Sequence, residues 1–451
     1  TTEIYTLSLH DALPICKTLI RTAHVYHEMK HAERYGLPRV DVPPVDFRDI
    51  AARIRSVIER IQAHDSQERF CQLGARIEFG EAVFADEHSI RLNGRTLSAR
   101  SWVVATGSSA AVPPIPGLSD TPYLTNKDVF TLDHLPRSLI VLGGGAIGLE
   151  MAQAFCRLGS RVTVVELARQ ILPNEDGDLA ELVMGVIEQE GVRFVLGTKA
   201  VAFKDLGTER CLTIQAENGE RSDLKAEAIL LAVGRTANVN GLGLESTGVT
   251  FDRRGIRVDE RLRASPHKHI YAAGDVTGTY QFTHAAGYEG SIVISNAVLH
   301  LPRKASYTFF PWCTYTSPEL ASIGMNEKRA REAGIAYSVL TEEMVGNDRS
   351  LAEGQEVGRI KLLLDERERP LGVQILGPHA GDLISEWVAA LNGNVKLAVL
   401  SAAVHPYPTL AEINKRVVGK LYSTKIFSEK VRKTLKFLFS FKGRACEPPA
   451  Q

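Results

Sequence analysis

The chain has 451 residues, 44% of them hydrophobic, and its 53 Lys and Arg residues are balanced by 53 Asp and Glu residues. This length allows two to four domains, and the balanced charge excludes a strong overall attraction to nucleic acid or anionic lipid. The six cysteines form no short-spaced pair, which argues against a zinc site and a secreted disulfide framework. With no apolar run of 18 residues and no signal-peptide pattern, we expect a cytoplasmic protein.

The first part of the chain changes from helices to strands. The spacing of apolar residues predicts helices over 17–35 and 47–65, separated by a proline-rich stretch. Short strands are expected next, with a hairpin turn at Asn93 and Gly94. A buried strand and a proline-rich connector that ends at Gly117 then mark a domain boundary.

Residues 138–234 alternate strands and helices, which is typical of a parallel α/β sheet. In "SLIVLGGGAIGLEMAQAFCRLGSRVTVVE" an apolar strand precedes Gly143, Gly145 and Gly148, a helix follows, and a second strand ends at Glu166. Gly143 permits the tight turn, Gly145 lets the backbone approach a pyrophosphate, and Gly148 lets the helix pack closely on the strand. The complete pattern predicts a dinucleotide site.

Glu166 also predicts which dinucleotide binds. Its carboxylate is expected to accept hydrogen bonds from an adenosine ribose and to repel a 2′-phosphate, which favours NAD over NADP. Arg169 lies close enough in the sequence to pair with such a phosphate, so NADP stays open.

A second nucleotide signal is the strand-to-turn segment "HIYAAGDVTG" at 269–278. A backbone amide at Gly274 and the carboxylate of Asp275 can be directed at the end of a bound dinucleotide. Taken alone, the same residues are an ordinary connection. From about residue 306, strands grouped with longer helices indicate a separate α+β domain.

Five segments, in this order, resemble the class I pyridine nucleotide-disulfide oxidoreductases, the flavoprotein family that contains dihydrolipoamide dehydrogenase, glutathione reductase and mercuric reductase. They are "VVATGS", the glycine fingerprint, "AVGRTAN", "IYAAGDV" and "HPYPTLAEI". The resemblance implies an α/β fold with two Rossmann-like domains, for FAD and NAD(P), and a C-terminal α+β dimerisation domain. It also implies a homodimer and the cofactors FAD and NAD(P)H, with NAD favoured.

The resemblance further implies domain boundaries and cofactor-binding residues. We expect foreign or junction sequence at 1–16, an FAD domain from 17–118 and 238–305 without its N-terminal βαβ unit, an NAD(P) domain at 119–237, an interface domain at 306–430, and a basic helix and tail at 431–451. The cofactor-binding residues implied by the motifs are Thr106, Gly107, Gly143, Gly145, Gly148, Glu166, Gly234, Gly274 and Asp275.

The stretch "PICKTLI" at 14–20 corresponds to the start of the family's redox helix, where members carry Cys-x4-Cys and then Pro-Ser-Lys. In this register Lys17 matches the lysine, Cys16 falls on the serine, and neither redox position is cysteine. Lys17 is implied to lie by the flavin N5 and to pair with Glu150. A thiol beside a lysine at a helix start can have a lowered pKa, but one thiol cannot cycle as a dithiol. We therefore expect the chain as written not to turn over and to bind FAD weakly or not at all.

The C-terminal motif implies the acceptor side of the active site. Disulfide reductases place a histidine base five residues before a glutamate, whereas Tyr407 stands five before Glu412 and His405 matches a non-catalytic histidine. A phenol with a pKa near ~10 is a poor base at neutral pH. Mercuric reductases are similar here, with a tyrosine that faces a thiolate-bound metal, but they carry a C-terminal cysteine pair where this chain has only Cys446.

The predicted function is an FAD-dependent NAD(P)H oxidoreductase, closest to mercuric-reductase-like members, that passes electrons to a disulfide or a thiophilic metal ion. A flavoprotein transhydrogenase and a non-catalytic, dimeric NAD-binding protein stay open as alternatives. The basic stretch "KIFSEKVRKTLKFLFSFKGR" is interpreted as a terminal helix docked on the dimer, with membrane-surface contact as its alternative.

Overall fold

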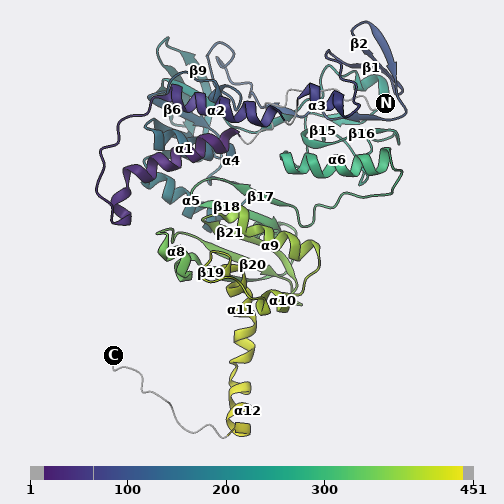
Figure 1. Ribbon diagram of the computed structural model, residues 1–451. Coiled ribbons are helices and arrows are strands. Elements are labelled where there is room, and N and C mark those ends of the chain that lie inside the picture. The colour runs from purple at the N-terminus through teal and green to yellow at the C-terminus, as the bar shows by residue number, and fades with distance from the viewer. Residues whose placement is uncertain (1–14, 64–65, 440–451) are drawn as a thin grey trace. The chain divides into compact units, whose positions relative to one another are not determined.

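The structure is a computed structural model that describes residues 15–63 and 66–439 (Figure 1). The chain forms two compact units. The first comprises the chain up to Pro173 together with Val183–Tyr307, and the second comprises Asn174–Leu182 together with the chain from Thr308 onward. The prediction of foreign sequence over 1–16 falls almost entirely outside the described residues.

The first unit opens with the two predicted helices, α1 (Ile15–Lys30) and α2 (Phe47–Gln62). Helix α1 packs against α2 and against α4 (Ala146–Leu158), and it buries Leu19 and Ala23. Two short elements, η2 (Ala32–Tyr35) and α3 (Gln67–Gln72), lie on either side of α2 in the sequence.

The predicted hairpin is present between β2 (Ser89–Leu92) and β3 (Arg95–Ser98), and β1 (Val83–Asp86) completes an antiparallel sheet. Its turn residues, Asn93 and Gly94, have φ angles of 51° and 75°. Because a two-residue hairpin with a positive φ at both positions matches the twist of the strands, the Asn-Gly pair fixes this turn.

A parallel pair of strands, β4 (Trp102–Val104) and β16 (Ile270–Ala272), joins distant parts of the first unit. The side chains of Trp102 and Val104 are buried in a core with Ile270, whereas Val103 is 50% exposed. Smaller elements of the first unit are β5 (Ser108–Ala110), η4 (Asp128–Phe130), β13 (Arg235–Ala237), η5 (Leu244–Thr247), β14 (Phe251–Asp252), β15 (Gly255–Ile256), η6 (Gly274–Thr277) and α6 (Thr283–Ala297).

The predicted parallel α/β sheet has the strand order β12-β6-β7-β8. Its strands are β6 (Ser138–Leu142), β7 (Arg161–Val165), β8 (Arg193–Val195) and β12 (Ala228–Leu231), and α4 and α5 (Gly177–Gln189) are its helices. An antiparallel sheet of β9 (Thr198–Asp205), β10 (Arg210–Ala216) and β11 (Arg221–Ala226) follows β8. Since β6 lies inside the parallel sheet, the turn after it opens at the carboxyl ends of the strands, where such folds bind nucleotides.

The second unit is α+β, as predicted, and contains an antiparallel sheet of order β17-β18-β21-β20-β19. The strands are β17 (Pro311–Thr314), β18 (Glu319–Gly324), β19 (Ser338–Glu343), β20 (Arg359–Leu364) and β21 (Pro370–Gly377). The helical elements are α7 (Glu327–Glu332), η7 (Met344–Gly346), α8 (Asp348–Ala352), α9 (Ala380–Asn392), α10 (Leu397–Ala402), α11 (Glu412–Ile426) and α12 (Glu429–Phe439). The core of this unit lies between the sheet, α9 and α11, around the buried side chain of Trp387.

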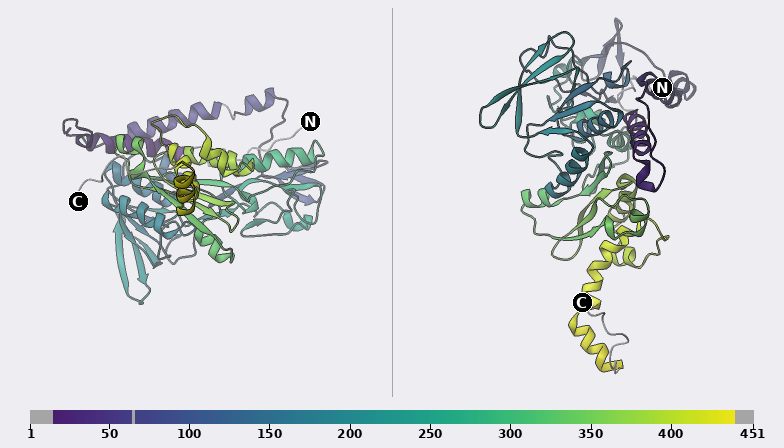
Figure 2. Two further views of the ribbon diagram at one scale, coloured as in Figure 1. Left: turned by 90° about the horizontal axis from the view of Figure 1, so that it is seen from below. Right: turned by 90° about the vertical axis from the view of Figure 1, so that its left-hand side faces the viewer.

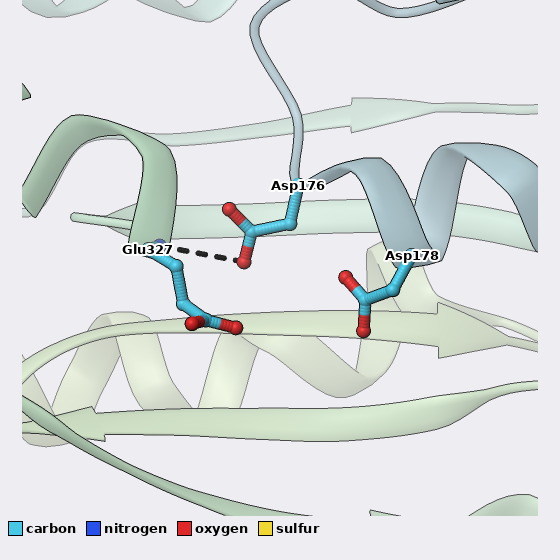
Figure 3. A group of neighbouring side chains, drawn as sticks. All are labelled: Asp176, Asp178 and Glu327. Carbon is cyan, nitrogen blue, oxygen red and sulfur yellow. Dashed lines mark hydrogen bonds between the residues drawn. The ribbon is translucent and has the colours of Figure 1, made fainter. Parts of the chain in front are cut away.

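Three carboxylates of the second unit, from Asp176, Asp178 and Glu327, lie as close together as metal ligands do (Figure 3). The ammonium of Lys361 is 2.8 Å, 2.9 Å and 2.5 Å from their respective oxygens, and the lysine side chain is 2% exposed. Burial lowers the pKa of Lys361, but its hydrogen bonds to the carboxylates outweigh burial and raise the pKa. The cluster is therefore a buried ion network that holds the start of α5 against β20.

Candidate active site

In the glycine turn between β6 and α4, one glycine has free space where a side chain would lie, and two glycines have none. Gly143 has a φ of +113°, and a Cβ there would lie 2.3 Å from the carbonyl oxygen of Ala232. A Cβ on Gly148 would lie 2.0 Å from the carbonyl oxygen of Gly143, whereas a Cβ on Gly145 would meet nothing within 4 Å. Because α4 begins directly after Gly145, the open space faces the helix N-terminus, an arrangement that fits a pyrophosphate.

Glu166, directly after β7, reaches back to this turn. Its Oε2 accepts a 2.6 Å hydrogen bond from the amide of Gly144, and its Oε1 accepts a 2.8 Å hydrogen bond from the amide of Ala168. The two amides fix the carboxylate beside the open position at Gly145. This placement fits the predicted contact with an adenosine ribose.

Arg169, the candidate ligand for a 2′-phosphate, is paired with Glu217 instead. Its Nε and one terminal nitrogen donate to the two carboxylate oxygens over 2.8 Å and 2.6 Å. Both side chains are exposed, so water and salt screen the pair. A phosphate would have to compete with Glu217 for the guanidinium.

Asp275 connects three of the sequence motifs. Its Oδ2 accepts a 2.5 Å hydrogen bond from the hydroxyl of Ser108 and lies 3.5 Å from Nε of Arg235. Arg235 also donates to the Ser108 hydroxyl over 2.6 Å. The carboxylate at the end of β16 is therefore held in place by the segments around β5 and β13.

Thr106, Gly107 and Gly234 shape the backbone around this carboxylate. The hydroxyl of Thr106 donates to the carbonyl of Asn238 over 2.7 Å, and the Asn238 side chain returns a 2.9 Å bond to the Thr106 carbonyl. Gly107 and Gly234 have φ angles of +69° and +118°, which other residues rarely adopt. The reciprocal bonds lock together two segments that are more than 130 residues apart.

A buried glutamate that the motifs did not indicate supports the Gly274 turn. Glu289 of α6 is fully buried, and its two oxygens accept hydrogen bonds from the Gly274 amide (2.7 Å) and the Tyr307 hydroxyl (2.6 Å). Burial raises the pKa of Glu289, although these hydrogen bonds oppose the shift. The Gly274 amide is therefore engaged within the protein, and Asp275 is the group of this pair that can meet a cofactor.

Lys17 and Glu150 form the expected ion pair between α1 and α4. The Nζ of Lys17 lies 2.7 Å from Oε2 of Glu150, whose side chain is 5% exposed. Burial lowers the pKa of Lys17, but the charges of Glu150 and Cys16 and its hydrogen bonds outweigh burial and raise the pKa. The ammonium charge is thus fixed on α1.

The expectation that Cys16 can have a lowered pKa is wrong. Burial raises the pKa of its thiol, and the nearby carboxylate of Glu150 raises it further, while Lys17 opposes both. The lysine charge is already shared with Glu150, so it stabilises a thiolate too little to overcome burial.

In the second unit, Tyr407 pairs with Asp348. Its hydroxyl donates to Oδ2 of Asp348 over 2.8 Å, and the tyrosine side chain is 70% exposed. The hydrogen bond and the charge of Asp348 raise the pKa of Tyr407, and Glu412 at the start of α11 adds a smaller repulsion. The phenol therefore keeps its proton at neutral pH. Asp348 lies 59 residues earlier in the chain, so no motif around Tyr407 could have indicated it.

His405 has a different environment. Its Nε2 lies 3.0 Å from Oε1 of Glu386, and its Nδ1 is buried without a hydrogen-bond partner among the described residues. The other oxygen of Glu386 accepts from Asn414, which in turn accepts from the indole of Trp387. His405 thus belongs to a polar network beside the core of the second unit, and it does not share the exposed position of Tyr407.

The predicted residues fall in the two units. The first unit holds Lys17, Glu150, Thr106, Gly107, Gly143, Gly145, Gly148, Glu166, Gly234, Gly274 and Asp275, and the second unit holds Tyr407 and Glu412. The parallel α/β sheet with its glycine turn is the fold expected of a dinucleotide-binding oxidoreductase.

Comparison with known proteins gives the same class. The family described as pyridine nucleotide-disulphide oxidoreductase matches residues 7–290, and the dimerisation domain of that family matches residues 310–418. The chain belongs to this family. Family members use FAD and NAD(P)H, so the chain is an FAD-dependent NAD(P)H oxidoreductase by family, and its dimerisation domain supports a homodimer.

Individual relatives cover most of the chain. A dihydrolipoyl dehydrogenase of Thermus scotoductus is 34% identical over 88% of this chain and 85% of its own length. A mercuric reductase of Streptomyces lividans is 33% identical over the same shares. The solved structure of the HOCl-induced flavoprotein disulfide reductase RclA from Escherichia coli superposes with a TM-score of 0.79 at 25% identity, over 92% of this chain and 93% of that one.

Proposed function

We propose that the protein is an NADH-preferring flavoprotein reductase that passes electrons to a thiophilic metal ion or a disulfide at a site containing Tyr407. The observation that carries the proposal is the Tyr407–Asp348 pair, since an exposed phenol with a raised pKa occupies the position of the usual histidine base. The relatives support the same range of acceptors, since they include a mercuric reductase and a disulfide reductase whose Cu(II) complex has been solved.

Different residues of the first unit would bind NADH and FAD. The open position at Gly145 and the carboxylate of Glu166 would hold NADH. The carboxylate of Asp275 would accept a hydrogen bond from a hydroxyl group of the sugar chain of FAD. FAD, when bound, takes a hydride from the nicotinamide and returns two electrons to an acceptor. Lys17, held by Glu150, would place a positive charge where negative charge develops on the reduced cofactor.

Tyr407 would act as a proton donor or a ligand. Because Asp348 raises the pKa of the phenol, the hydroxyl cannot remove a proton at neutral pH. Its one O–H bond donates to Asp348, so it would donate to an acceptor only by exchanging that hydrogen bond, while its oxygen lone pairs can act as a ligand. The hydride of NADH, which carries two electrons and one proton, together with one proton from the medium converts a disulfide to two thiols. The same two electrons reduce a divalent thiophilic ion to the metal and release one proton.

An acceptor comparison tests the proposal. Because no turnover is expected without a redox cysteine pair, the chain is supplied with FAD and given a family segment that carries Cys-x4-Cys ahead of Lys17. NADH oxidation is then followed with Hg(II) in excess thiol and with a small disulfide. Faster NADH oxidation with either acceptor, reduced in Tyr407→Phe, supports the proposal. Equal rates in the presence and absence of both acceptors contradict it.

A transhydrogenase is the second candidate, and Cys16 favours it. The thiol of Cys16 is buried with a raised pKa, which makes it a poor nucleophile, whereas hydride transfer between two nicotinamides needs no thiol. Reduction of a nicotinamide analogue by NADPH in Cys16→Ser, at the rate of the unaltered chain, would favour this function. Loss of the reaction on that substitution would exclude it.

We also propose that the chain holds FAD weakly. Among the described residues, the groups that fit this cofactor are Asp275 and the Lys17–Glu150 pair, and both are assigned to its ribitol and flavin end. Few contacts at one end of a long cofactor give low affinity. A visible spectrum of the desalted protein tests this: stoichiometric flavin absorbance contradicts weak binding.

For location, we propose the cytoplasm. Cys16, Cys71, Cys156 and Cys211 are free thiols. Free thiols spread through a chain fit a reducing compartment.

A further inference from the structure

Helix α12 (Glu429–Phe439) has an apolar side that the second unit does not cover. Successive residues of a helix are about 100° apart, so Val431, Leu435, Leu438 and Phe439 fall within one arc of about 100°. Leu435 is 40% exposed, Leu438 63% and Phe439 65%, and the helix buries none of its residues. Figures 1 and 2 show α12 continuing from α11 away from the sheet of its unit.

Basic side chains border this apolar arc. The helix carries Lys430, Arg432, Lys433 and Lys436 against the single acidic residue Glu429. Arg432 and Lys436 lie next to the Phe439 edge of the arc, and Lys433 pairs with Glu429 over 2.9 Å. Phe437, which is 84% exposed, lies on the opposite side between Lys430 and Lys433. The helix therefore has one continuous apolar side, and an excess of positive charge lies around it.

Helix α12 lies beyond the segment that matches the dimerisation domain. That match ends at residue 418, within α11, and α12 begins eleven residues later. Leucine side chains as exposed as those of Leu435 and Leu438 favour a partner surface, because water disfavours such apolar area.

We propose that α12 docks on the surface of an anionic lipid membrane, with its axis parallel to the surface. Its leucine and phenylalanine side chains would enter the boundary between headgroups and acyl chains, and Arg432 and Lys436 would meet lipid phosphates. At about 1.5 Å per residue the helix is roughly half as long as a bilayer core is thick, so it lies on the surface. None of the described helices is long and apolar enough to cross a bilayer.

Charge favours lipid over a second copy of the same helix. Two copies of α12 packed through their apolar sides would bring the Arg432 and Lys436 edges of both helices together, and like charges repel. Anionic headgroups instead neutralise these side chains while the acyl boundary takes up the apolar arc. Docking would place an NAD(P)H-dependent reductase at a membrane surface.

Vesicle flotation of the full chain tests the proposal, with vesicles of phosphatidylcholine alone and of phosphatidylcholine with phosphatidylglycerol. We expect binding to the anionic vesicles that falls with added salt. Arg432→Gln with Lys436→Gln should weaken partitioning about thirtyfold, because each basic residue near an anionic surface contributes about fivefold. Leu435→Gln with Leu438→Gln should abolish binding.

The matched control is Arg367→Gln with Lys396→Gln, which removes two exposed charges elsewhere in the second unit and should leave binding unchanged. Circular dichroism of each variant confirms that it is folded. Three outcomes overturn the proposal: no binding of the unaltered chain to anionic vesicles, equal binding by the α12 variants and the control, or a change in oligomer size of the α12 variants without vesicle binding. The last outcome would assign the helix to a second copy of the chain.

Discussion

The glycine turn and the Tyr407 region, which we propose serve different parts of one reaction, are built from contacts of different range. Glu166 reaches an amide only 22 residues earlier in the chain, within one strand, helix and strand. Tyr407 takes its partner, Asp348, from 59 residues away, and the buried lysine of the same unit reaches across more than 180 residues to Asp176. The first region is specified mainly within one strand, helix and strand, apart from the carbonyl of Ala232 that limits Gly143. The second depends on charges that only the folded unit brings together.

The largest effect is expected where long-range charges are buried. Lys361→Met leaves the carboxylates of Asp176, Asp178 and Glu327 without their cation, so unfolding should become easier by about 3 to 5 kcal/mol. Lys425→Met removes a cation from an exposed pair and serves as the control. Chemical denaturation measures both. Equal stability of the two variants would contradict the assignment of the cluster as an essential ion network.

Two alanine substitutions separate packing from binding in the glycine turn. In Gly148→Ala the new methyl group meets a carbonyl oxygen, so stability should fall by about 1 to 3 kcal/mol. In Gly145→Ala the methyl group meets open space, so the melting temperature should hold while NADH binding weakens by about tenfold or more. Thermal unfolding and calorimetry measure the two effects. If both variants lost stability alike, Gly145 would have a packing role.

Glu166→Gln tests the choice of cofactor in the local region. The substitution removes the charge that repels a 2′-phosphate and weakens one hydrogen-bond acceptor, so the preference for NADH over NADPH should fall about tenfold. Calorimetry with both nucleotides measures it, and Glu217→Gln, which frees Arg169, is the matched variant. Equal or tighter binding of NADPH by the unaltered chain would instead make Arg169 a phosphate ligand.

A smaller effect is expected for the ionisation of Tyr407. Asp348 raises the pKa of the phenol, so Asp348→Asn should move its deprotonation to lower pH, towards about 10. Ultraviolet difference titration against Tyr407→Phe isolates this group from the other tyrosines. The unaltered phenol stays protonated through the neutral pH range. Its hydrogen bond to Asp348 should therefore be lost only at a pH above the ordinary pKa of a tyrosine. An unchanged midpoint in Asp348→Asn would show that the two side chains do not interact in solution.

The sequence predicted those parts of the site that are determined by residues close together in the chain. The turn at Gly143, the helix after Gly145 and the carboxylate at Glu166 follow from consecutive residues, and the Lys17–Glu150 pair followed from a family resemblance. Most of the secondary structure was predictable for the same reason, since periodicity and turn residues are local.

The partners of the predicted residues were not predictable. Glu289 and Asp348 carry no local motif, and they become functional only because folding places them against Gly274 and Tyr407. The pKa of Cys16 was misjudged because burial, which outweighs the nearby lysine, is a property of the packed structure. The sequence showed the positive charge of Lys17 next to Cys16, but it did not show that the thiol of Cys16 is buried away from water.

The central claim is that the two regions divide the reaction, with the glycine turn serving NADH and Tyr407 serving the acceptor. Stopped-flow measurement of the two half-reactions tests it most directly, in chains that carry Cys-x4-Cys ahead of Lys17, with FAD supplied and with Tyr407 either unaltered or changed in Tyr407→Phe. We predict that NADH reduces the flavin at the rate of the unaltered chain, while reoxidation by the thiol-bound metal or disulfide slows about tenfold or more. Equal slowing of both half-reactions would contradict the division and make Tyr407 a packing residue.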